Sequence, residues 1–523
     1  MVGWLGATIL TNGGAIIDAN GHNITIGSAI THGSGALTDG GLTKIGAGTL
    51  TLTNANSYNG GTVVKNGTLA INGQFALGGA VYGGLTLSNA STLQYTAPPL
   101  ANTADVSVFN GLTLGVGGAT IDLNGNPVTY GFGIGNNGSG SLAVVSTTPG
   151  GVLTLNGANA FFGGAPVSYS GGTTVDANST LVVNSTAGSA TGSGAVTVNG
   201  VLGGRGLVAG NTTVNGSTYP GFGQAGAGAT NTFGGNLTYA GSGSTFHLGA
   251  TATGGGNDMI VLTNSSATLD FSSAIQINID CGASLDQSHD YVLFKLTGTS
   301  PSILNAGNLN ATPNFIASTP AYSADYTIYR TNNTVVLHVN LPSPNITSAT
   351  ATPNPALENQ TVVISVAATP VSPATIDPNT GVVVDISGLG GSSAYPLVYN
   401  GAGSYTNRYH LNPDVTSGSL NLLVSVTDSA SLLTSIYIPL TVGVTNLTWN
   451  GGGTPGNKYW SNFANWVGLI QPALNGDSFT FAGNVGLVAD MENNYSVAAL
   501  TFSSGAGAFH IVATKAGLKQ YLQ

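Results

Sequence analysis

The chain has 523 residues and a net charge of −10, and only 5% of its residues are charged. Nine Lys and Arg with no basic stripe exclude nucleic-acid binding, and 41% hydrophobic residues exclude a disordered polyanion. No apolar run reaches about 18 residues, so we expect no membrane span. The single Cys281, expected to be buried, leaves no disulfide framework and no thiolate metal site.

The first half of the chain repeats itself. Three segments recur 103 to 111 residues apart, namely GGAIIDANG (Gly13–Gly21) as GGATIDLNG (Gly117–Gly125), GTLTLTNAN (Gly48–Asn56) as GVLTLNGAN (Gly151–Asn159), and YNGGTVVKNGTLAIN (Tyr58–Asn72) as YSGGTTVDANSTLVVN (Tyr169–Asn184). The offset grows by eight residues around Phe161–Ser168, where we predict an inserted loop between rungs.

Within the repeats, segments of three to five residues with apolar side chains at alternate positions are separated by Asn-Gly and Gly-Gly turns. Gly and Asn adopt the positive φ of such turns at little cost. Antiparallel hairpins and a coiled parallel solenoid both use this pattern. The fixed spacing, with Thr and Asn recurring beside the turns, favours the solenoid.

The stretch GGLTKIGAGTLTLTNANSYNGGTVVKNGTLAING (Gly40–Gly73) resembles the autotransporter-associated β-strand repeat, the passenger repeat of bacterial autotransporter-like proteins. Thr191–Gly223 and the stretch that begins at Gly234 resemble the same family, so the resemblance covers roughly residues 1–340. It implies a right-handed parallel β-helix on an exported protein, serving as a stalk or an adhesive surface, and it implies no reaction.

Neither end of the chain is typical of a complete protein. Residues 1–14 lack a basic segment before an apolar core, so we expect no signal peptide in this chain. Ile9–Gly14 aligns with Thr113–Gly118, so the chain begins in mid-repeat. We therefore expect a piece of a longer protein, located outside the cell or on the surface of a Gram-negative-type bacterium.

Beyond the β-helix of residues 1–341, the composition changes. Residues 342–445 open with a Pro-, Asn- and Thr-rich stretch and continue with about seven longer alternating strands, which predict a β-sandwich. This part resembles bacterial immunoglobulin-like surface modules, although the Cys and Trp landmarks of that fold are missing. Residues 446–523 resemble the opening of another passenger repeat region, so we predict the first rungs of a second β-helix there.

Several acidic residues are candidates for catalytic or metal-binding groups. Asp18 and Asp122 occupy matched repeat positions before Asn-Gly turns, where we expect them to cap the turns about five rungs apart. The densest polar group is Asp280, Asp286, His289 and Asp290. It offers an acid, a base or a cation site, but its sequence is also typical of a turn followed by a strand.

Two further motifs have alternative interpretations. Thr253–Val261 resembles one copy of the calcium-binding nonapeptide G-G-x-G-x-D-x-U-x, with Asp258 at the acidic position, but such sites need successive copies, so a plain Gly-rich turn is favoured. Trp449, Trp460 and Trp466, with Tyr459, are candidates for stacking on sugars. We favour a hydrophobic cap over the next β-helix, because solenoid ends need caps.

The sequence thus predicts an all-β protein: a right-handed parallel β-helix, an immunoglobulin-like β-sandwich and the start of a second β-helix. We expect a non-enzymatic structural or adhesive protein with no catalytic, cofactor-binding or metal-binding residues and no cofactor. The expected partners are cell-surface glycans or other surface proteins. The alternative is a carbohydrate-binding or polysaccharide-degrading β-helix protein.

Overall fold

The computed structural model describes residues 8–33, 37–78, 83–96, 105–108, 111–135, 139–157, 169–185, 187–223, 228–282, 284–320, 322–412, 415–443, 446–452, 456–468, 472, 475–493 and 495–512. The chain divides into two compact units, residues 1–340 and 341–523. In the described ranges all regular structure is β-strand apart from short 3-10 turns, which confirms the predicted all-β class. The 3-10 turns are η1 (Gln74–Leu77), η2 (Ala306–Asn308), η3 (Ser323–Asp325), η4 (Ser387–Leu389) and η5 (Phe463–Asn465). No helix in these ranges is long and apolar enough to cross a membrane.

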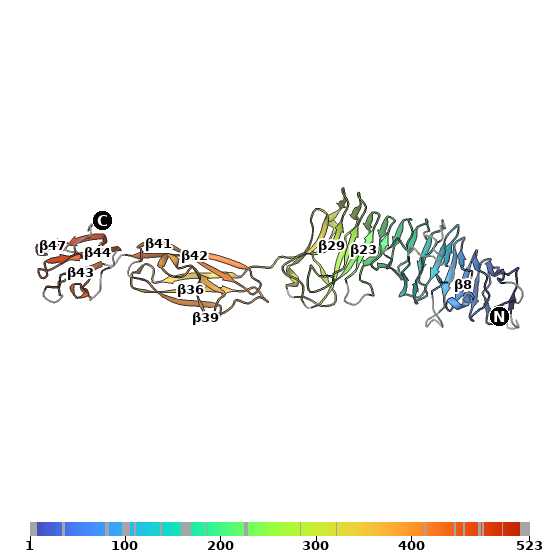
Figure 1. The fold of residues 1–523 in the computed structure, drawn as a ribbon, viewed down its shortest axis with the longest axis horizontal. Helices are drawn as coiled ribbons and strands as arrows, with labels where there is room; N and C mark the ends of the chain where they lie inside the picture. Colours follow the sequence, from blue (N-terminus) through green and yellow to red (C-terminus); the bar gives the residue numbers. More distant parts are fainter. Residues whose placement is uncertain are drawn as a thin grey trace. The chain divides into compact units, whose positions relative to one another are not determined.

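The first unit is a parallel β-helix whose rungs stack along one direction (Figure 1). Its longest sheet has twelve parallel strands, each contributed by a successive turn of the coil. In stacking order they are β3 (Ile24–Ile26), β6 (Thr49–Leu52), β8 (Thr68–Ile71), β10 (Ser91–Tyr95), β12 (Ala119–Asp122), β14 (Leu142–Val145), β16 (Thr173–Val175), β18 (Val196–Val198), β21 (Thr212–Val214), β24 (Leu237–Tyr239), β27 (Thr268–Phe271) and β30 (Ser302–Leu304). The predicted solenoid is confirmed.

Shorter parallel sheets form the other faces of the coil. A five-stranded sheet near the N-terminus contains β2 (Ala15–Asp18), β5 (Leu42–Ile45), β7 (Thr62–Val64), β9 (Leu85–Leu87) and β11 (Leu112–Leu114). An eight-stranded sheet contains β13 (Pro127–Tyr130), β15 (Gly151–Leu155), β17 (Ser179–Val183), β19 (Val201–Gly203), β22 (Ser217–Tyr219), β25 (Gly243–Leu248), β28 (Gln276–Cys281) and β31 (Asn314–Phe315). At the N-terminal end, β1 (Thr8–Leu10) pairs in parallel with β4 (Ile30–His32).

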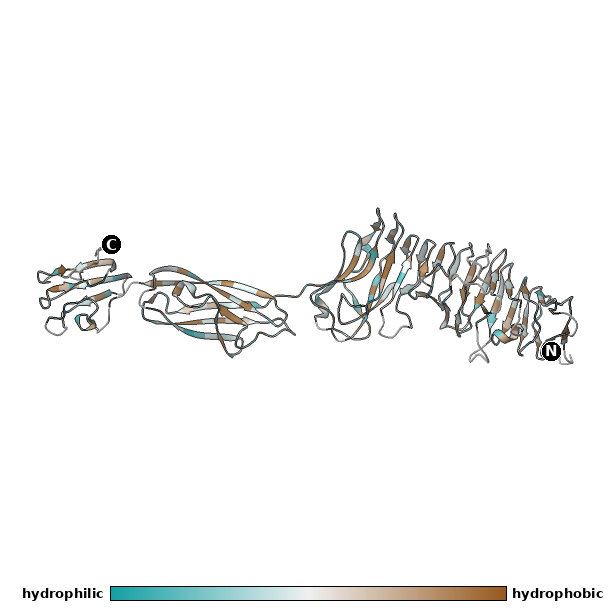
Figure 2. Ribbon diagram, viewed as in Figure 1, coloured by the Kyte–Doolittle hydropathy of each residue, from teal (hydrophilic) through white to brown (hydrophobic). Residues whose placement is uncertain are grey.

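Strand alternation separates an apolar lumen from a neutral surface. In the twelve-stranded sheet, one inward column stacks residue on residue: Leu50, Leu69, Leu93, Ile121, Val144, Val175, Val198, Val214, Tyr239 and Phe271. All of these side chains are buried. The adjoining outward column is Thr49, Thr68, Thr92, Thr120, Ala143, Thr174, Thr197, Thr213 and Thr238, half-exposed or exposed. Figure 2 shows brown residues recurring along the strands of this unit.

An antiparallel hairpin closes the C-terminal end of the β-helix. A six-stranded sheet begins with four parallel strands: β20 (Leu207–Val208), β23 (Thr230–Phe233), β26 (Met259–Leu262) and β29 (Tyr291–Leu296). Next to β29, β33 (Thr334–Val339) and then β32 (Tyr326–Arg330) pair in antiparallel orientation. These strands cover the last parallel edge, as a solenoid terminus requires.

The two copies of the repeat do not occupy the same faces. β2 and β7 of the first copy lie in the five-stranded sheet, whereas the matching β12 and β16 lie in the twelve-stranded sheet. Likewise β6 lies in the twelve-stranded sheet and the matching β15 in the eight-stranded one. β11 lies in the five-stranded sheet, whereas the matching β1 pairs with β4 in a separate sheet, so the second copy is shifted by one face from its first strand. The inserted loop predicted at Phe161–Ser168 lies outside the described residues.

The second unit begins with two facing sheets that share one apolar core. One sheet is antiparallel and contains β34 (Asn345–Thr352), β36 (Thr361–Thr369), β40 (Ser404–His410) and β39 (Val398–Gly401). The other contains β35 (Ala356–Leu357), β42 (Leu433–Gly443), β41 (Gly418–Thr427), β37 (Val382–Val384) and β38 (Tyr395–Pro396). This is a β-sandwich; its assignment as immunoglobulin-like stays a prediction.

Parallel strands return in the last part of the chain. β43 (Asn446–Trp449), β44 (Asn475–Phe481) and β46 (Ser496–Phe502) form one parallel sheet. β45 (Val488–Asp490) and β47 (His510–Val512) form another. These strands stack as successive turns around an aromatic core, as predicted for the start of a second β-helix.

Candidate functional site

The four residues predicted to form the densest polar group do not make one site. Asp280, Asp286 and Asp290 each pair with a different histidine, because Asp280 points outward from β28 while the other two follow it in a turn. The four side chains therefore do not converge on one acid–base or cation site, and their placement fits the interpretation as a turn followed by a strand. Among the residues that the structure describes, no three His, Cys, Asp or Glu side chains converge to hold a metal ion.

Asp280 belongs to a ladder on the outer face of the eight-stranded sheet. His247 of β25 stacks directly on Asp280 of β28, and its Nδ1 lies 3.3 Å from the carboxylate. The hydroxyl of Tyr219 donates to the same carboxylate at 2.9 Å. Burial and the adjacent carboxylate raise the pKa of Tyr219. The phenol is therefore a fixed donor, unsuited to act as a base near neutral pH.

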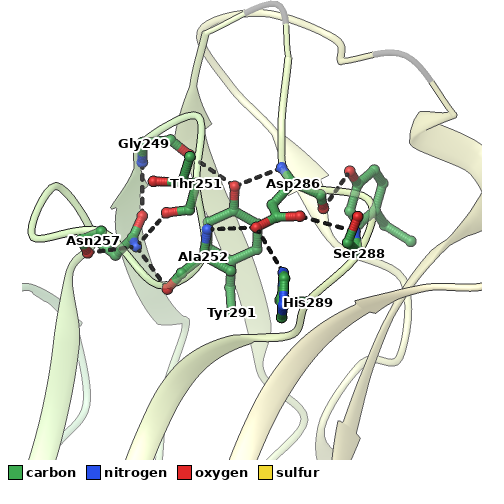
Figure 3. A network of polar contacts seen from close by, with 10 residues as sticks. Gly249, Thr251, Ala252, Asn257, Asp286, Ser288, His289 and Tyr291 are labelled. Atoms are coloured by element: carbon green, nitrogen blue, oxygen red, sulfur yellow. Dashed lines mark hydrogen bonds and ion pairs between the residues drawn. The ribbon is translucent and has the colours of Figure 1, made fainter.

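Asp286 ties two loops together, as Figure 3 shows. Its carboxylate accepts the backbone N–H of Ser288 at 2.8 Å and that of Ala252 at 3.1 Å, and it lies 3.3 Å from Nδ1 of His289. The N–H of Ser288, followed by that of Ala252 and by His289, holds the pKa of Asp286 below its usual value. The ionised carboxylate thus links the turn that follows β25 to the turn that follows β28.

Tyr291 completes the same network. Its hydroxyl donates to the carbonyl of Gly249 at 2.8 Å and accepts the N–H of Asp286 at 2.7 Å (Figure 3). Burial raises the pKa of this phenol. The hydroxyl is thus engaged both as a donor and as an acceptor by backbone groups. Tyr291 therefore positions the two loops and is not available as a catalytic group.

Asp290 forms the third pair. It lies 2.6 Å from Nδ1 of His338 on β33, and the hydroxyl of Tyr329 on β32 donates to it at 3.1 Å. The Tyr329 and His338 rings meet edge to face at 5.5 Å. All three side chains fasten the turn before β29 to the terminal hairpin, so the group stabilises the cap.

The calcium-like motif is a Gly-rich turn organised by its own amide. Nδ2 of Asn257 donates to the carbonyls of Thr251, Ala252 and Gly254 at 2.8 to 3.1 Å, and its Oδ1 accepts the N–H of Gly249 at 2.8 Å (Figure 3). The carbonyl oxygens that a bound cation would need are therefore already engaged by the Asn257 amide nitrogen.

Asp258, the acidic residue of that motif, is fully buried. Its carboxylate accepts three backbone N–H groups, from Gly221, Ala229 and His247, at 2.8 to 2.9 Å. Burial raises its pKa, against the opposing effect of these three donors. The carboxylate therefore joins segments of successive rungs.

Asp18 and Asp122 cap turns, as predicted. Oδ1 of Asp18 accepts the N–H of Asn20 at 2.9 Å, and Oδ1 of Asp122 accepts that of Asn124 at 3.0 Å. They lie in different sheets, since β2 and β12 are on different faces. The free Cys281 is buried, as expected.

Two charged groups that we had not singled out lie near the N-terminus. The ammonium of Lys44, buried on β5, donates to the carbonyls of Ile45, Gly46 and Asn66 at 2.8 to 3.3 Å. The carboxylate of Asp39 accepts three backbone N–H groups and lies 3.0 Å from His32. The alternation LTKI, which puts Lys44 on the lumen side with Leu42, is the sequence signal that indicates a buried lysine.

The tryptophans form a core. Trp449, Trp460 and Trp466 are at most 1% exposed and pack against Phe479 and Phe481 at centroid distances from 4.7 Å. Their faces are covered by other rings, so they are not open to sugars. The interpretation as a hydrophobic cap over the following rungs fits this burial, while Tyr459 stays 43% exposed.

A pocket of about 420 Å³ lies beside this core. Trp449, Leu487 and Val488 provide its apolar lining, and Asn457 and Lys458 provide polar groups. The Lys458 ammonium lies 3.5 Å from the buried carboxylate of Asp490, so its charge is already matched.

Comparison with known proteins supports the repeat assignment. The family model for the passenger-associated-transport-repeat matches residues 42–71 and 150–177, which contain strands β5 to β8 and β15 to β16. Over 201 residues the chain is 32% identical to "Adhesin BmaC autotransporter" of Brucella suis biovar 1 (strain 1330). The match covers 34% of this chain and 6% of the adhesin, so the chain spans a small fraction of that relative.

Proposed function

We propose that this chain, a passenger repeat protein of the autotransporter type, is a non-enzymatic stalk with an adhesive outer surface. In this proposal the β-helix acts as a rigid spacer, and its neutral Thr- and Asn-rich faces make the contacts. The location that fits is the bacterial surface or the extracellular medium, and the partners are cell-surface glycans or other surface proteins.

The observation that carries the proposal is the unbroken twelve-stranded parallel sheet over a largely apolar lumen. Each rung bonds to the rungs before and after it, so the unit resists bending between rungs. The outward column of Thr hydroxyls offers hydrogen bonds without charge. Such a surface suits many weak contacts better than one deep binding site.

The state of the ionisable groups supports a role without catalysis. Asp39, Asp258 and Asp286 accept backbone N–H groups. A general base needs access to a substrate proton, and these carboxylates are engaged in holding turns. Adhesion itself is supported by the name of the relative from Brucella suis, which is an adhesin.

Attachment of beads that carry the full chain tests the proposal. We expect such beads to bind host cells or matrix-coated glass, and we expect Leu93→Asp, which puts a charge in the lumen, to abolish binding with loss of the β-helix. The matched control is Thr92→Ala on the outer face of the same strand, which keeps the fold. Absence of attachment by the folded chain, or release of sugar products from a polysaccharide panel, would refute the proposal.

The pocket beside Trp449 favours the alternative of a carbohydrate-binding protein. Its volume of about 420 Å³ lies within the range of small-ligand sites, roughly 300–1,000 Å³. A glycan array with the full chain and with Val488→Trp, which would fill the pocket, tests this role. Binding that is lost in the variant supports it, and an array without signal rules it out.

A further inference from the structure

The Asn66-Gly67 turn of the β-helix is arranged differently from five other Asn-Gly turns of the described residues. The N–H of Gly67 points at the side chain of the residue before it, Oδ1 of Asn66, at 2.6 Å. In comparable turns the glycine N–H is bound elsewhere: Gly21 to Ala47, Gly60 to Asp39, Gly125 to Ser146, Gly216 to Val198 and Gly451 to Asn465.

The contact holds the Gly67 nitrogen close to Cγ of Asn66, the atom that this nitrogen attacks when Asn-Gly forms a succinimide. In that reaction the nitrogen of the following residue attacks Cγ of the asparagine. Since a C=O bond is about 1.23 Å long, Cγ of Asn66 lies no farther than about 3.8 Å from the Gly67 nitrogen. Reacting atoms in near-attack conformers lie about 3–3.5 Å apart, so a small torsional change completes the approach.

Lys44 supplies the second element of the site. Its ammonium donates at 3.0 Å to the main-chain carbonyl of Asn66, the oxygen that shares the amide with the attacking nitrogen. Loss of the Gly67 amide proton leaves negative charge on this oxygen, and an ammonium fixed beside developing charge lowers its cost. Bonds to the carbonyls of Ile45 and Gly46 hold the ammonium in place, and the whole side chain is buried.

The position of Gly67 has no room for a side chain. A Cβ there would lie 2.5 Å from the carbonyl oxygen of Gly48 and 2.7 Å from Nζ of Lys44, and the residue has a φ of +67°. Asn66 itself is exposed, so water and hydroxide reach its side chain. The turn therefore combines an unhindered nucleophile, a fixed cation and access to solvent.

We propose that Asn66 is a site of spontaneous covalent modification, in which Lys44 promotes succinimide formation and deamidation. A solvent base takes the Gly67 amide proton, the nitrogen bonds to Cγ of Asn66, and Nδ2 leaves as ammonia after protonation by water. Water then opens the succinimide to aspartate or isoaspartate. The product places a carboxylate near the buried ammonium of Lys44.

The second repeat copy provides an internal reference. Val144 on β14 stacks between Ile121 and Val175, so no lysine lies in that part of the lumen. The N–H of Ser179, after Asn178, donates to the main-chain carbonyl of Asp176 at 3.1 Å. Asn178 therefore lacks both elements of the site at Asn66.

Peptide mapping of the full chain during incubation at mildly alkaline pH tests the proposal, with mass spectrometry and isoaspartate methylation as readouts. We expect Asn66 to convert about tenfold faster or more than Asn20, Asn59, Asn124, Asn178 and Asn215, equivalent to about 1.4 kcal/mol of barrier. In concentrated urea the Asn-Gly sites should convert at similar rates, because the folded geometry is lost.

Lys44→Met tests the role of the ammonium, with circular dichroism to confirm the fold. We expect the rate at Asn66 to fall by about tenfold while the other sites keep theirs. If the variant does not fold, the comparison of sites in the native chain with those in urea decides alone. Equal rates at Asn66 and the reference sites in the folded chain, an unchanged rate at Asn66 in folded Lys44→Met, or a stable cross-link of Lys44 to Asn66 would overturn the proposal.

Discussion

At the scale of single residues, acidic side chains act as anionic links between turns of the β-helix. A carboxylate that accepts several backbone N–H groups satisfies donors that a coil of short strands leaves without a strand partner. Asp39, Asp258 and Asp286 all do this. In a chain with so few charges, most of the acids that might have served chemistry serve the backbone.

Asp258 gives a direct test of this role. Asp258→Asn replaces one acceptor oxygen by an NH2 group that faces backbone donors, so at least one buried N–H loses its partner. We expect the free energy of unfolding of the β-helix to fall by about 1–3 kcal/mol. Hydrogen exchange at Gly221, Ala229 and His247 measures the local effect. Asp270→Asn is the matched control, since its single bond from Asn305 survives and the stability should stay within about 0.5 kcal/mol.

The lowered pKa of Asp39 determines how we expect the N-terminal rungs to respond to acid. Burial would raise its pKa, but the N–H of Asn59, His32 and the N–H groups of Gly60 and Gly41 together lower it. A lowered folded pKa means that the ionised form stabilises the folded chain. The contribution is complete above the unfolded pKa of about 3.9 and is lost as the pH falls through the folded pKa.

We therefore expect protection from hydrogen exchange at Gly41, Asn59 and Gly60 to collapse below about pH 4, after correction for intrinsic exchange. In Asp39→Asn the same amides should show weaker protection that no longer changes in this range. A wild-type profile that stays flat down to the folded pKa would contradict the assignment.

At the scale of elements, the β-helix is stabilised by columns of buried apolar side chains that stack in register from one rung to the next. Leu93 of β10 is fully buried between Leu69 and Ile121, whereas Thr92 beside it faces solvent between Thr68 and Thr120. We expect Leu93→Ala to cost about 2–5 kcal/mol, because the rigid rungs above and below cannot close the cavity. Thr92→Ala should change stability by no more than about 0.5 kcal/mol. Urea unfolding of both variants, followed by circular dichroism, checks the difference.

The coil itself was predictable from the sequence, because strand alternation and Asn-Gly turns act over a few residues. The shift of the repeat by one face was not. GGAIIDANG and GGATIDLNG are nearly identical, yet β2 and β12 lie in different sheets because β11 takes the position before β12. Face assignment depends on how many strands each turn of the coil contains, and loop lengths do not encode that number locally.

The same reason explains why the densest polar group of the sequence does not form one site. Asp280, Asp286 and Asp290 are close in sequence, but a partner such as His247 or His338 comes from 33 or 48 residues away. Only the stacking register of the rungs brings such residues together. By contrast, the cap role of Asp18 and Asp122 was predictable, since the acceptor and donor are two residues apart.

At the scale of the whole molecule, the chain is built from separate cores. The apolar cluster of the β-helix ends at Leu337, and the sandwich and the tryptophan cluster each have their own. Cooperativity in solenoids passes between neighbouring rungs, and each of these clusters consists of its own set of packed side chains. We therefore expect the β-helix and the tryptophan cluster to unfold independently.

Tryptophan fluorescence isolates one of these transitions. Trp449, Trp460 and Trp466 all lie in the last core, and a Trp4→Phe background removes the remaining tryptophan, which lies outside the described residues. In this background, Leu93→Ala should shift the circular dichroism transition of the β-helix and leave the fluorescence transition unchanged. Phe479→Ala, which removes a ring between Trp460 and Trp466, should lower the fluorescence midpoint by an amount equivalent to about 3–5 kcal/mol and leave the β-helix unaffected. A shift of both transitions by either variant would show that the cores are coupled, because only shared contacts carry a local loss of packing from one core to another.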